Sequence, residues 1–263
     1  MVTAYDYTMA ALAAGSAVDC VLVGDSLAMV MHGKASTIWA SDTVMALHTK
    51  AVAAAVKNKL IIADMPFLSF RKGPDKAMNC VEKLVKSGAQ AVKLEGVDGH
   101  EDVIKRIIDS DIPVMGHLGL TPQSIRKFGN YRTQGRDKVS AGRIFRQAEK
   151  LEKLGCFSLV LECVPPDLAE KITRSLKIPV IGIGAGPYTD GQVLVMQDLL
   201  GLYGDITPSF VKKYLDGRKL VIGALNNFDG EIKSGRFPGR PARKNGKEVR
   251  GSQGITTPPL DPC

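Results

Sequence analysis

The chain has 263 residues, of which 44% are hydrophobic and 24% charged, with a net charge of +8. This length suits one large α/β domain, and no apolar run approaches the roughly 20 residues that span a bilayer. Half of the net charge, +4, lies in the tail from Arg236 onward, which has six basic and two acidic residues. Because basic and aromatic residues do not interleave as in base-stacking proteins, we expect no nucleic-acid partner and no membrane partner.

Apolar, β-branched runs recur between helical patterns, which is typical of buried parallel strands. These runs are residues 2–4, 20–25, 60–65, 91–96, 112–119, 157–163, 178–186 and the weaker 198–203. Helical spacing of apolar residues is clearest over 74–88, 101–110, 144–155 and 168–176. Eight strands alternating with helices predict an α/β fold, a (β/α)8 TIM barrel, with a doubly wound open sheet as the alternative.

The ends of the chain differ from its body. Residues 240–263 are rich in Gly, Pro, Arg and Lys without periodicity, so we predict one catalytic domain over 1–239 and a basic, disordered tail over 240–263. A strand starting at residue 2 leaves no room for a secretory signal.

The five cysteines are odd in number and lack metal-site spacing, which favours reduced thiols in the cytoplasm. A mitochondrial location is the alternative if a targeting segment precedes this chain.

Charged side chains stand where the predicted strands end. Asp25, Asp64, Glu95, His117 and Glu162 end the second to sixth strands in turn. Catalytic groups of parallel barrels lie at this end of the strands. Any one acid could instead cap the following helix. Four carboxylates around one mouth repel each other, so we expect a cation between them or a proton on one of them.

The type of these side chains indicates which cation the mouth would hold. Oxygen donors without a Cys pair or a His-x-x-x-His pattern favour a hard ion, and Asp25, Asp64 and Glu95 make a candidate Mg²⁺ site. Lys93 precedes Glu95 by two residues and therefore points to the same side of the strand, where it could hold a substrate carboxylate. The alternative for Lys93 is an outward-facing surface residue. The glycines of GIGAG (182–186) could bind phosphate at a helix N-terminus, and the alternative is close packing at the mouth.

Seven sequence blocks occur together in an order and spacing that resemble one enzyme family. The blocks are TAYDY (3–7), LVGDSL (22–27), ADMPF (63–67), VKLEG (92–96), GHLGLTPQS (116–124), LVLECVP (159–165) and PVIGIGAG (179–186) with TDGQVLVM (189–196). Together they resemble the ketopantoate (3-methyl-2-oxobutanoate) hydroxymethyltransferase family over residues 2 to 239, including FPG at 237–239.

The resemblance implies a (β/α)8 barrel of the phosphoenolpyruvate/pyruvate-binding type. It implies transfer of a hydroxymethyl group from the co-substrate 5,10-methylenetetrahydrofolate to 3-methyl-2-oxobutanoate. The product is 2-dehydropantoate, on the route to pantothenate and coenzyme A, and the reaction proceeds through a Mg²⁺-stabilised enolate. The resemblance also implies a homo-oligomer, usually a decamer. For the glycines of GIGAG (182–186), room for the folate is then a third alternative.

Residue by residue, the resemblance assigns the metal and the oxo acid. Asp25, Asp64 and Glu95 match the family's Mg²⁺ ligands. Asp25, Ser26, Asp64 and Lys93 match its contacts to the oxo acid. A 2-oxo acid chelates Mg²⁺ through its carboxylate and ketone oxygens, so a metal and a substrate site at the same strand ends are chemically consistent.

Glu162 matches the family's proton acceptor and is the one strand-end acid left once the metal site is built, so it is the candidate base for the C3 proton. His117 lies at the same metal-side mouth. The loop HGKASTIW (32–39) departs from the family pattern, with Ala35 in place of an acid and Trp39 in place of Pro. We also expect the chain to lack the helical segment that precedes TAYDY in family members.

Two other functions remain as alternatives. A Mg²⁺-dependent carbon–carbon lyase of the isocitrate-lyase or phosphoenolpyruvate mutase type would share the fold, the metal and the enolate chemistry. Such lyases carry a catalytic Cys in a Lys-Lys-Cys-Gly-type loop, which this sequence lacks. A non-enzymatic basic scaffold would have no use for acids at four successive strand ends.

Overall fold

Two compact units make up the chain, Met1–Leu215 and Asp216–Cys263. The structure is a computed structural model, and it describes residues 1–129, 132–204, 208–239, 243–244 and 247–248. The second unit contains helix α10 (Gly217–Lys233) and the antiparallel strands β9 (Arg243–Lys244) and β10 (Lys247–Glu248). Most of the tail predicted over 240–263 lies outside the described residues, so that boundary stays a prediction.

The first unit is built on one parallel sheet whose strands follow each other in chain order. The strands are β1 (Val2–Thr3), β2 (Cys20–Val23), β3 (Leu60–Asp64), β4 (Ala91–Glu95), β5 (Val114–Gly119), β6 (Ser158–Glu162), β7 (Val180–Ile183) and β8 (Gly191–Gln192). A parallel bridge between Val2 and Leu194 joins the two edges of the sheet. Consecutive order and joined edges confirm the barrel and exclude the doubly wound alternative, whose strand order reverses.

The eighth strand does not lie where the sequence indicated. Strand β8 is Gly191–Gln192, whereas the predicted segment 198–203 overlaps the end of helix α9 (Met196–Leu199) and forms no strand. Leu199 and Leu200 are apolar because they pack against the core around the sheet. Strand β8 has only two residues, and pairing with β7 fixes its place. A segment this short carries no apolar run, so the sequence prediction was wrong here.

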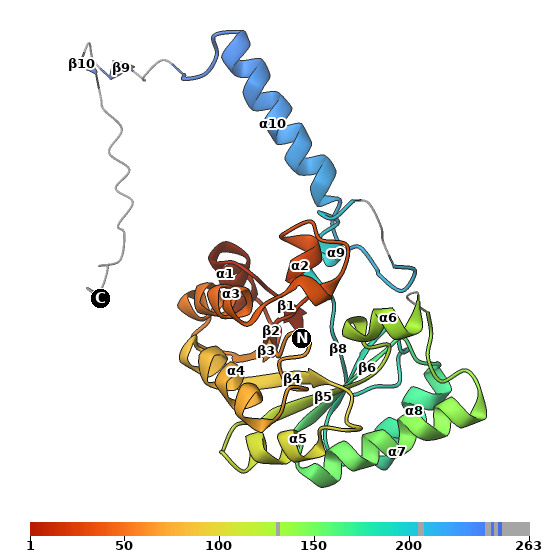
Figure 1. The fold of residues 1–263 in the computed structure, drawn as a ribbon. Helices are drawn as coiled ribbons and strands as arrows, with labels where there is room; N and C mark the ends of the chain where they lie inside the picture. The colour runs from red at the N-terminus through yellow and green to blue at the C-terminus, as the bar shows by residue number, and fades with distance from the viewer. Residues whose placement is uncertain (130–131, 205–207, 240–242, 245–246, 249–263) are drawn as a thin grey trace. The chain divides into compact units, whose positions relative to one another are not determined.

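Helices cover the outside of the sheet (Figure 1). The long ones are α1 (Tyr7–Ala14), α3 (Asp42–Ala55), α4 (Pro74–Lys86), α5 (Glu101–Ile108), α7 (Lys138–Leu154) and α8 (Pro166–Ser175). Short helices α2 (Leu27–Val30), η1 (Thr37–Trp39), η2 (Pro122–Ser124) and α6 (Ile125–Phe128) lie in the loops after β2 and β5. Within the described residues, no helix has both the length and the apolarity to cross a membrane.

The predicted helix limits are set by caps. Helix α4 begins at Pro74, whose missing N–H is not needed in a first turn, and the chain leaves it at Gly88 with φ +104°. A Cβ at Gly88 would lie 2.3 Å from the Ala53 Cβ, so glycine is also needed for packing against α3. The Asp137 carboxylate accepts hydrogen bonds from two N–H groups at the start of α7, and Gly155 ends it.

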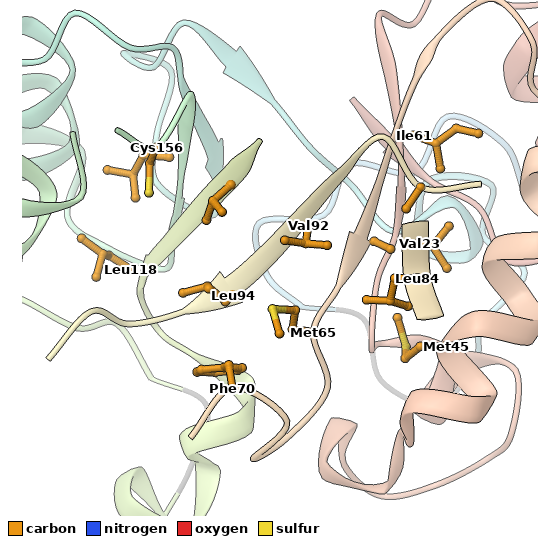
Figure 2. Packing of buried hydrophobic residues seen from close by; sticks show 14 of the residues in the cluster. Val23, Met45, Ile61, Met65, Phe70, Leu84, Val92, Leu94, Leu118 and Cys156 are labelled. Atoms are coloured by element: carbon orange, nitrogen blue, oxygen red, sulfur yellow. The ribbon is translucent and has the colours of Figure 1, made fainter. Parts of the chain in front are cut away.

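Two hydrophobic clusters stabilise the barrel. The outer cluster lies between the sheet and its helices; Figure 2 shows part of it, including Val92, Leu94 and Leu84. The inner cluster fills the barrel with Leu22, Ile62, Ala91, Met115, Val160 and Val193. Along β4, Lys93 and Glu95 follow Ala91 at steps of two, so both side chains point into the barrel above the inner cluster. The interior thus changes from apolar to polar toward the carboxyl ends of the strands.

Candidate active site

Five predicted site residues gather inside the barrel at the carboxyl ends of the strands, and we call this cluster of buried side chains the chamber. Asp25, Asp64, Lys93, Glu95 and His117 are each 5% exposed or less. In the strand register Asp64 pairs with Lys93, and Glu95 pairs with His117. Paired residues of parallel strands project to the same side, so these side chains are neighbours. The alternative of an outward-facing Lys93 is therefore excluded.

Asp64 is the best-paired carboxylate of the chamber. The Lys93 Nζ lies 2.9 Å from Asp64 Oδ1, and the backbone N–H of Asp25 donates to Asp64 Oδ2 at 3.0 Å. Gly24 makes room for this arrangement, because a Cβ there would lie 2.9 Å from Ser26 Oγ and 3.5 Å from Asp64 Oδ2. A side chain at the glycine of LVGDSL would therefore displace Ser26 Oγ from its place beside the chamber.

Gln123 is a chamber residue that the sequence analysis missed. Its side-chain Nε2 donates to Asp25 Oδ2 at 2.8 Å and to the Met65 carbonyl at 3.0 Å. Its backbone N–H donates to Glu95 Oε2 at 3.0 Å. One residue of the loop after β5 thus joins Asp25 to Glu95, and it is itself only 5% exposed. A glutamine between strands carries no burial signal of its own, although Gln123 stands in the block GHLGLTPQS (116–124) that was part of the resemblance.

His117 is held as a neutral imidazole. Burial and the nearby Lys93 ammonium lower the pKa of His117 well below its ordinary value. The Lys93 Nζ lies 3.3 Å from His117 Nδ1, so Nδ1 accepts and the proton of the ring belongs on Nε2. That Nε2 lies 3.3 Å from Glu162 Oε2. His117 therefore connects the buried lysine to the candidate base without adding a positive charge.

The chamber holds more carboxyl groups than cations. Burial, reinforced by the Asp64 charge, raises the pKa of Asp25 to about 7, and burial raises that of Glu162 to about 7. Burial and the Asp25 charge raise the pKa of Glu95 well above its ordinary value. Burial alone would lower the pKa of Lys93, but Asp64 and Asp25 outweigh it and raise the pKa. The chamber therefore retains protons near neutral pH and attracts any further cation.

The donor chemistry of Asp25, Asp64 and Glu95 fits a hard divalent cation, since all three offer buried carboxylate oxygens beside an excess of negative charge. Their present geometry does not close a metal site: in the described part of the chain, no group of three or more His, Cys, Asp or Glu side chains is placed to hold a metal ion. Internal hydrogen bonds, such as that from Gln123 to Asp25, engage oxygens of all three carboxylates. These carboxylate oxygens must therefore give up their hydrogen bonds before they can coordinate a cation.

Ser26 lies at the rim of the chamber, at the start of α2. Its Oγ lies 2.7 Å from the hydroxyl of Tyr5, a fully buried residue of the TAYDY block. Burial raises the pKa of Tyr5, so the phenol keeps its proton and can donate to Ser26 Oγ. Tyr5 is a second contact that the sequence analysis missed, although its block was part of the resemblance.

The glycine-rich segment GIGAG serves packing. The loop between Ile183 and Gly191 leads from β7 to β8 and contains no helix, so it offers no helix N-terminus to a phosphate. A Cβ at Gly184 would lie 2.7 Å from the Phe210 ring, and one at Gly186 would lie 2.6 Å from Pro166 Cβ. These contacts favour the close-packing interpretation over phosphate binding.

Solved structures of low sequence identity share this fold. The crystal structure of 2,3-dimethylmalate lyase, a PEP mutase/isocitrate lyase superfamily member, matches with a TM-score of 0.59 at 15% identity. The match covers 91% of this chain and 84% of that one. It supports the barrel fold and carries no information on the reaction.

Sequence comparison identifies the family. The 3-methyl-2-oxobutanoate hydroxymethyltransferase of Coxiella burnetii (strain CbuG_Q212) is 52% identical over 239 residues, with 90% of both chains covered. The enzyme of that name from Bdellovibrio bacteriovorus is 52% identical over 238 residues, again with 90% of both chains covered. A family model described as ketopantoate hydroxymethyltransferase matches residues 1–240. This chain belongs to the ketopantoate hydroxymethyltransferase family.

Proposed function

We propose that this protein is a 3-methyl-2-oxobutanoate hydroxymethyltransferase of pantothenate and coenzyme A biosynthesis. It transfers a one-carbon unit from 5,10-methylenetetrahydrofolate to 3-methyl-2-oxobutanoate and forms 2-dehydropantoate. The observation that carries this proposal is the 52% identity to enzymes of that name over 90% of both chains. The chamber contains the groups that such a reaction needs.

The oxo acid binds through its carboxylate and its ketone oxygen. Lys93 is the buried cation of the chamber and would attract the carboxylate, and Ser26 Oγ would donate a hydrogen bond to it. Asp25, Asp64 and Glu95 would hold Mg²⁺ beside this carboxylate. When bound, the ion would polarise the ketone and so acidify the hydrogen on C3. Fixing both ends of the oxo acid determines which face of C3 meets the folate.

Glu162 would remove the C3 hydrogen. Burial raises the pKa of Glu162 to about 7, so its carboxylate is a stronger base than an exposed glutamate, and about half of it is ionised at pH 7. His117 Nε2 lies 3.3 Å from Glu162 Oε2 without forming a hydrogen bond to it, so a small movement of either side chain would let the imidazole donate to this carboxylate. Water must take the methylene group from the folate as formaldehyde, which breaks both of its C–N bonds and releases tetrahydrofolate. The carbon that lost the hydrogen then attacks the formaldehyde carbon, and the C=O electron pair moves to the oxygen, which takes a proton and becomes the hydroxyl of 2-dehydropantoate.

Exchange of the C3 hydrogen in D₂O tests the first half of this reaction. With Mg²⁺ and 3-methyl-2-oxobutanoate but no folate, we expect the C3 proton signal to decay in NMR spectra. Glu162→Gln should slow the exchange by about 100-fold or more, a usual contribution of one positioned base. Exchange in Glu162→Gln at the rate of the parent would remove Glu162 from the mechanism.

The metal assignment has a separate test. EDTA should stop the exchange and Mg²⁺ should restore it, while Asp64→Asn should need a higher Mg²⁺ concentration than the parent. A decisive check is turnover with methylenetetrahydrofolate: formation of 2-dehydropantoate supports the transferase, whereas cleavage of a C–C bond in a 2-oxo acid would support the lyase alternative. The family resemblance also supports a cytoplasmic location and a homo-oligomer, usually a decamer. Light scattering would test the oligomeric state.

A further inference from the structure

A second concave surface lies at the same end of the barrel, outside the chamber, and we call it the rim groove. Its deeper part is a cavity of about 240 Å³ among the ends of β4 and β5, helix α6 and the first half of α7. A shallower part continues along α7 past Arg146 and Lys150. The deeper part is lined by polar and charged residues that include Arg71, Lys127, Gln134 and Arg143.

The rim groove adjoins the chamber through three backbone segments. Gly96 lines it and directly follows Glu95, whose carbonyl accepts a hydrogen bond from Arg71 Nη2 at 3.2 Å. Gly119 lines it next to Glu162, since a Cβ at Gly119 would lie 2.2 Å from the Glu162 carbonyl oxygen. The Gln134 N–H donates to the Cys163 carbonyl at 2.8 Å. These backbone segments form a wall common to the chamber and the groove, so a molecule that reached over this wall at the mouth would contact both.

The charge of the rim groove is mainly positive. Arg143, Arg146 and Lys150 lie along α7 at spacings of three and four residues, which places them on one helix face over roughly 10 Å. Lys127 adds a further cation in the deeper part. Asp98 is the acid that lines the groove, and its carboxylate lies 2.8 Å from Arg143 Nη2 and 3.9 Å from Lys150 Nζ. Lys150 also forms an ion pair with Glu101 beside the groove.

The ion pair of Asp98 and Arg143 does not block the groove. The side chains of both residues are about half exposed, at 44% and 56%. Exposed ion pairs contribute little to stability, so Arg143 can exchange Asp98 for a ligand carboxylate at low cost. The hydrogen bond from Arg143 lowers the pKa of Asp98, in keeping with a surplus of cations around this acid. The groove therefore suits a ligand with several carboxylates.

The folate co-substrate has such a part. Its pterin carries the one-carbon unit and must enter the chamber, whereas its glutamyl tail carries carboxylates and must leave through the mouth. Each additional γ-linked glutamate adds one carboxylate to the tail, and the cations of α7 continue in a row. We propose that the rim groove binds the glutamyl tail of the folate co-substrate and selects tails with several glutamates. This inference rests on the proposed transferase function.

The test compares folates that differ only in the tail. The KM of methylenetetrahydrofolate is measured with one and with five glutamates, for the parent and for the double variant Lys127→Gln/Arg146→Gln. For the parent, we expect the KM of the pentaglutamate to be at least about tenfold lower than that of the monoglutamate. In the variant, the ratio of these two KM values should be at least about fivefold smaller than in the parent. High salt should reduce the preference in the parent as well, because exposed charges are screened.

A matched control removes two charges elsewhere. Lys153 lies on the same helix α7 and Lys177 follows α8, and neither lines the groove. Lys153→Gln/Lys177→Gln should keep the preference of the parent. Thermal unfolding followed by circular dichroism verifies that each variant is folded.

The outcomes separate the two proposals. Parent enzyme that turns over the monoglutamate but shows no preference for the longer tail overturns the groove assignment and leaves the transferase intact. A preference that survives in Lys127→Gln/Arg146→Gln at the level of the control also overturns it. Absence of turnover with any folate overturns the transferase itself.

Discussion

Gly119 connects the architecture of the barrel to the candidate base, so its replacement by alanine tests both at once. Gly119 has φ +92°, and a Cβ there would lie 2.2 Å from the Glu162 carbonyl oxygen and 2.7 Å from Val164 Cγ1. The left-handed conformation costs a non-glycine residue about 1–2 kcal/mol. Overpacking adds about 1–3 kcal/mol, because the contact is with backbone that cannot rotate away. We therefore expect Gly119→Ala to lose about 2–5 kcal/mol of unfolding free energy.

Gly73 provides the control for this prediction. It also has φ +92°, but a Cβ there would meet nothing within 4 Å. Gly73→Ala should therefore lose only the conformational cost, which is about 1–3 kcal/mol for a backbone with φ 92° and ψ 164°. Urea unfolding of both variants measures the difference, which isolates the contact with Glu162. Equal losses in the two variants would refute the argument from packing.

The same variant has a catalytic readout. To relieve the contact, the end of β6 must move, and Glu162 moves with it. A displacement of about 1 Å can cost about 100-fold in rate, so C3 exchange in D₂O should fall by at least tenfold in Gly119→Ala but not in Gly73→Ala. Unchanged exchange in a destabilised Gly119→Ala would mean that Glu162 is not the base or that β6 does not move.

Three further predictions concern buried polar groups and thiols. The pKa of Glu162 is raised to about 7, so the folded protein binds this proton more tightly than the unfolded chain does, and stability is lost as the pH rises from about 4 to 7. Glu162→Gln should then stabilise the metal-free protein by about 2–3 kcal/mol more at pH 8 than at pH 5 in urea unfolding, and an equal effect at both pH values would contradict this. Gln123→Met should lower the free energy of unfolding by about 1–3 kcal/mol, because it leaves the Asp25 carboxylate without its side-chain donor. The control Gln197→Met replaces another buried glutamine, whose Oε1 has no hydrogen-bond partner, and should lower this free energy less. Burial raises the pKa of Cys80 and Cys156 to about 12, so a disulfide reagent at pH 8 should leave both thiols unmodified until the protein unfolds.

The features of the fold that depend on local sequence could be predicted. Apolar runs located the first seven strands, and capping residues such as Pro74 and Gly155 located the helix ends. The position of Lys93 relative to Glu95 followed from the two-residue repeat of a strand, which the structure confirms. These inferences succeed because the spacing of apolar residues reflects both the repeat of a helix or strand and the face of it that is buried.

Features fixed by contacts between distant segments could not be predicted. Strand β8 exists because Gly191 and Gln192 pair with β7, and its own two residues have no strand signature. Gln123 is buried because its loop folds over the chamber and meets Asp25, which is 98 residues away in sequence. The rim groove likewise needs the ends of β4 and β5 to lie beside α7, which only the closed barrel provides.

The chamber is a place where stability and function oppose each other. Asp25, Glu95 and Glu162 all have pKa values raised mainly by burial, so each must keep a proton or destabilise the folded protein near neutral pH. A cation that binds in the chamber displaces such protons. The carboxylates, which otherwise repel each other, are then attracted to the cation. Anything that binds only the folded state stabilises it by mass action. If the proposed Mg²⁺ site is correct, Mg²⁺ should therefore raise the unfolding temperature more at pH 8, where fewer protons compete, than at pH 6, whereas Asp64→Asn should reduce this gain.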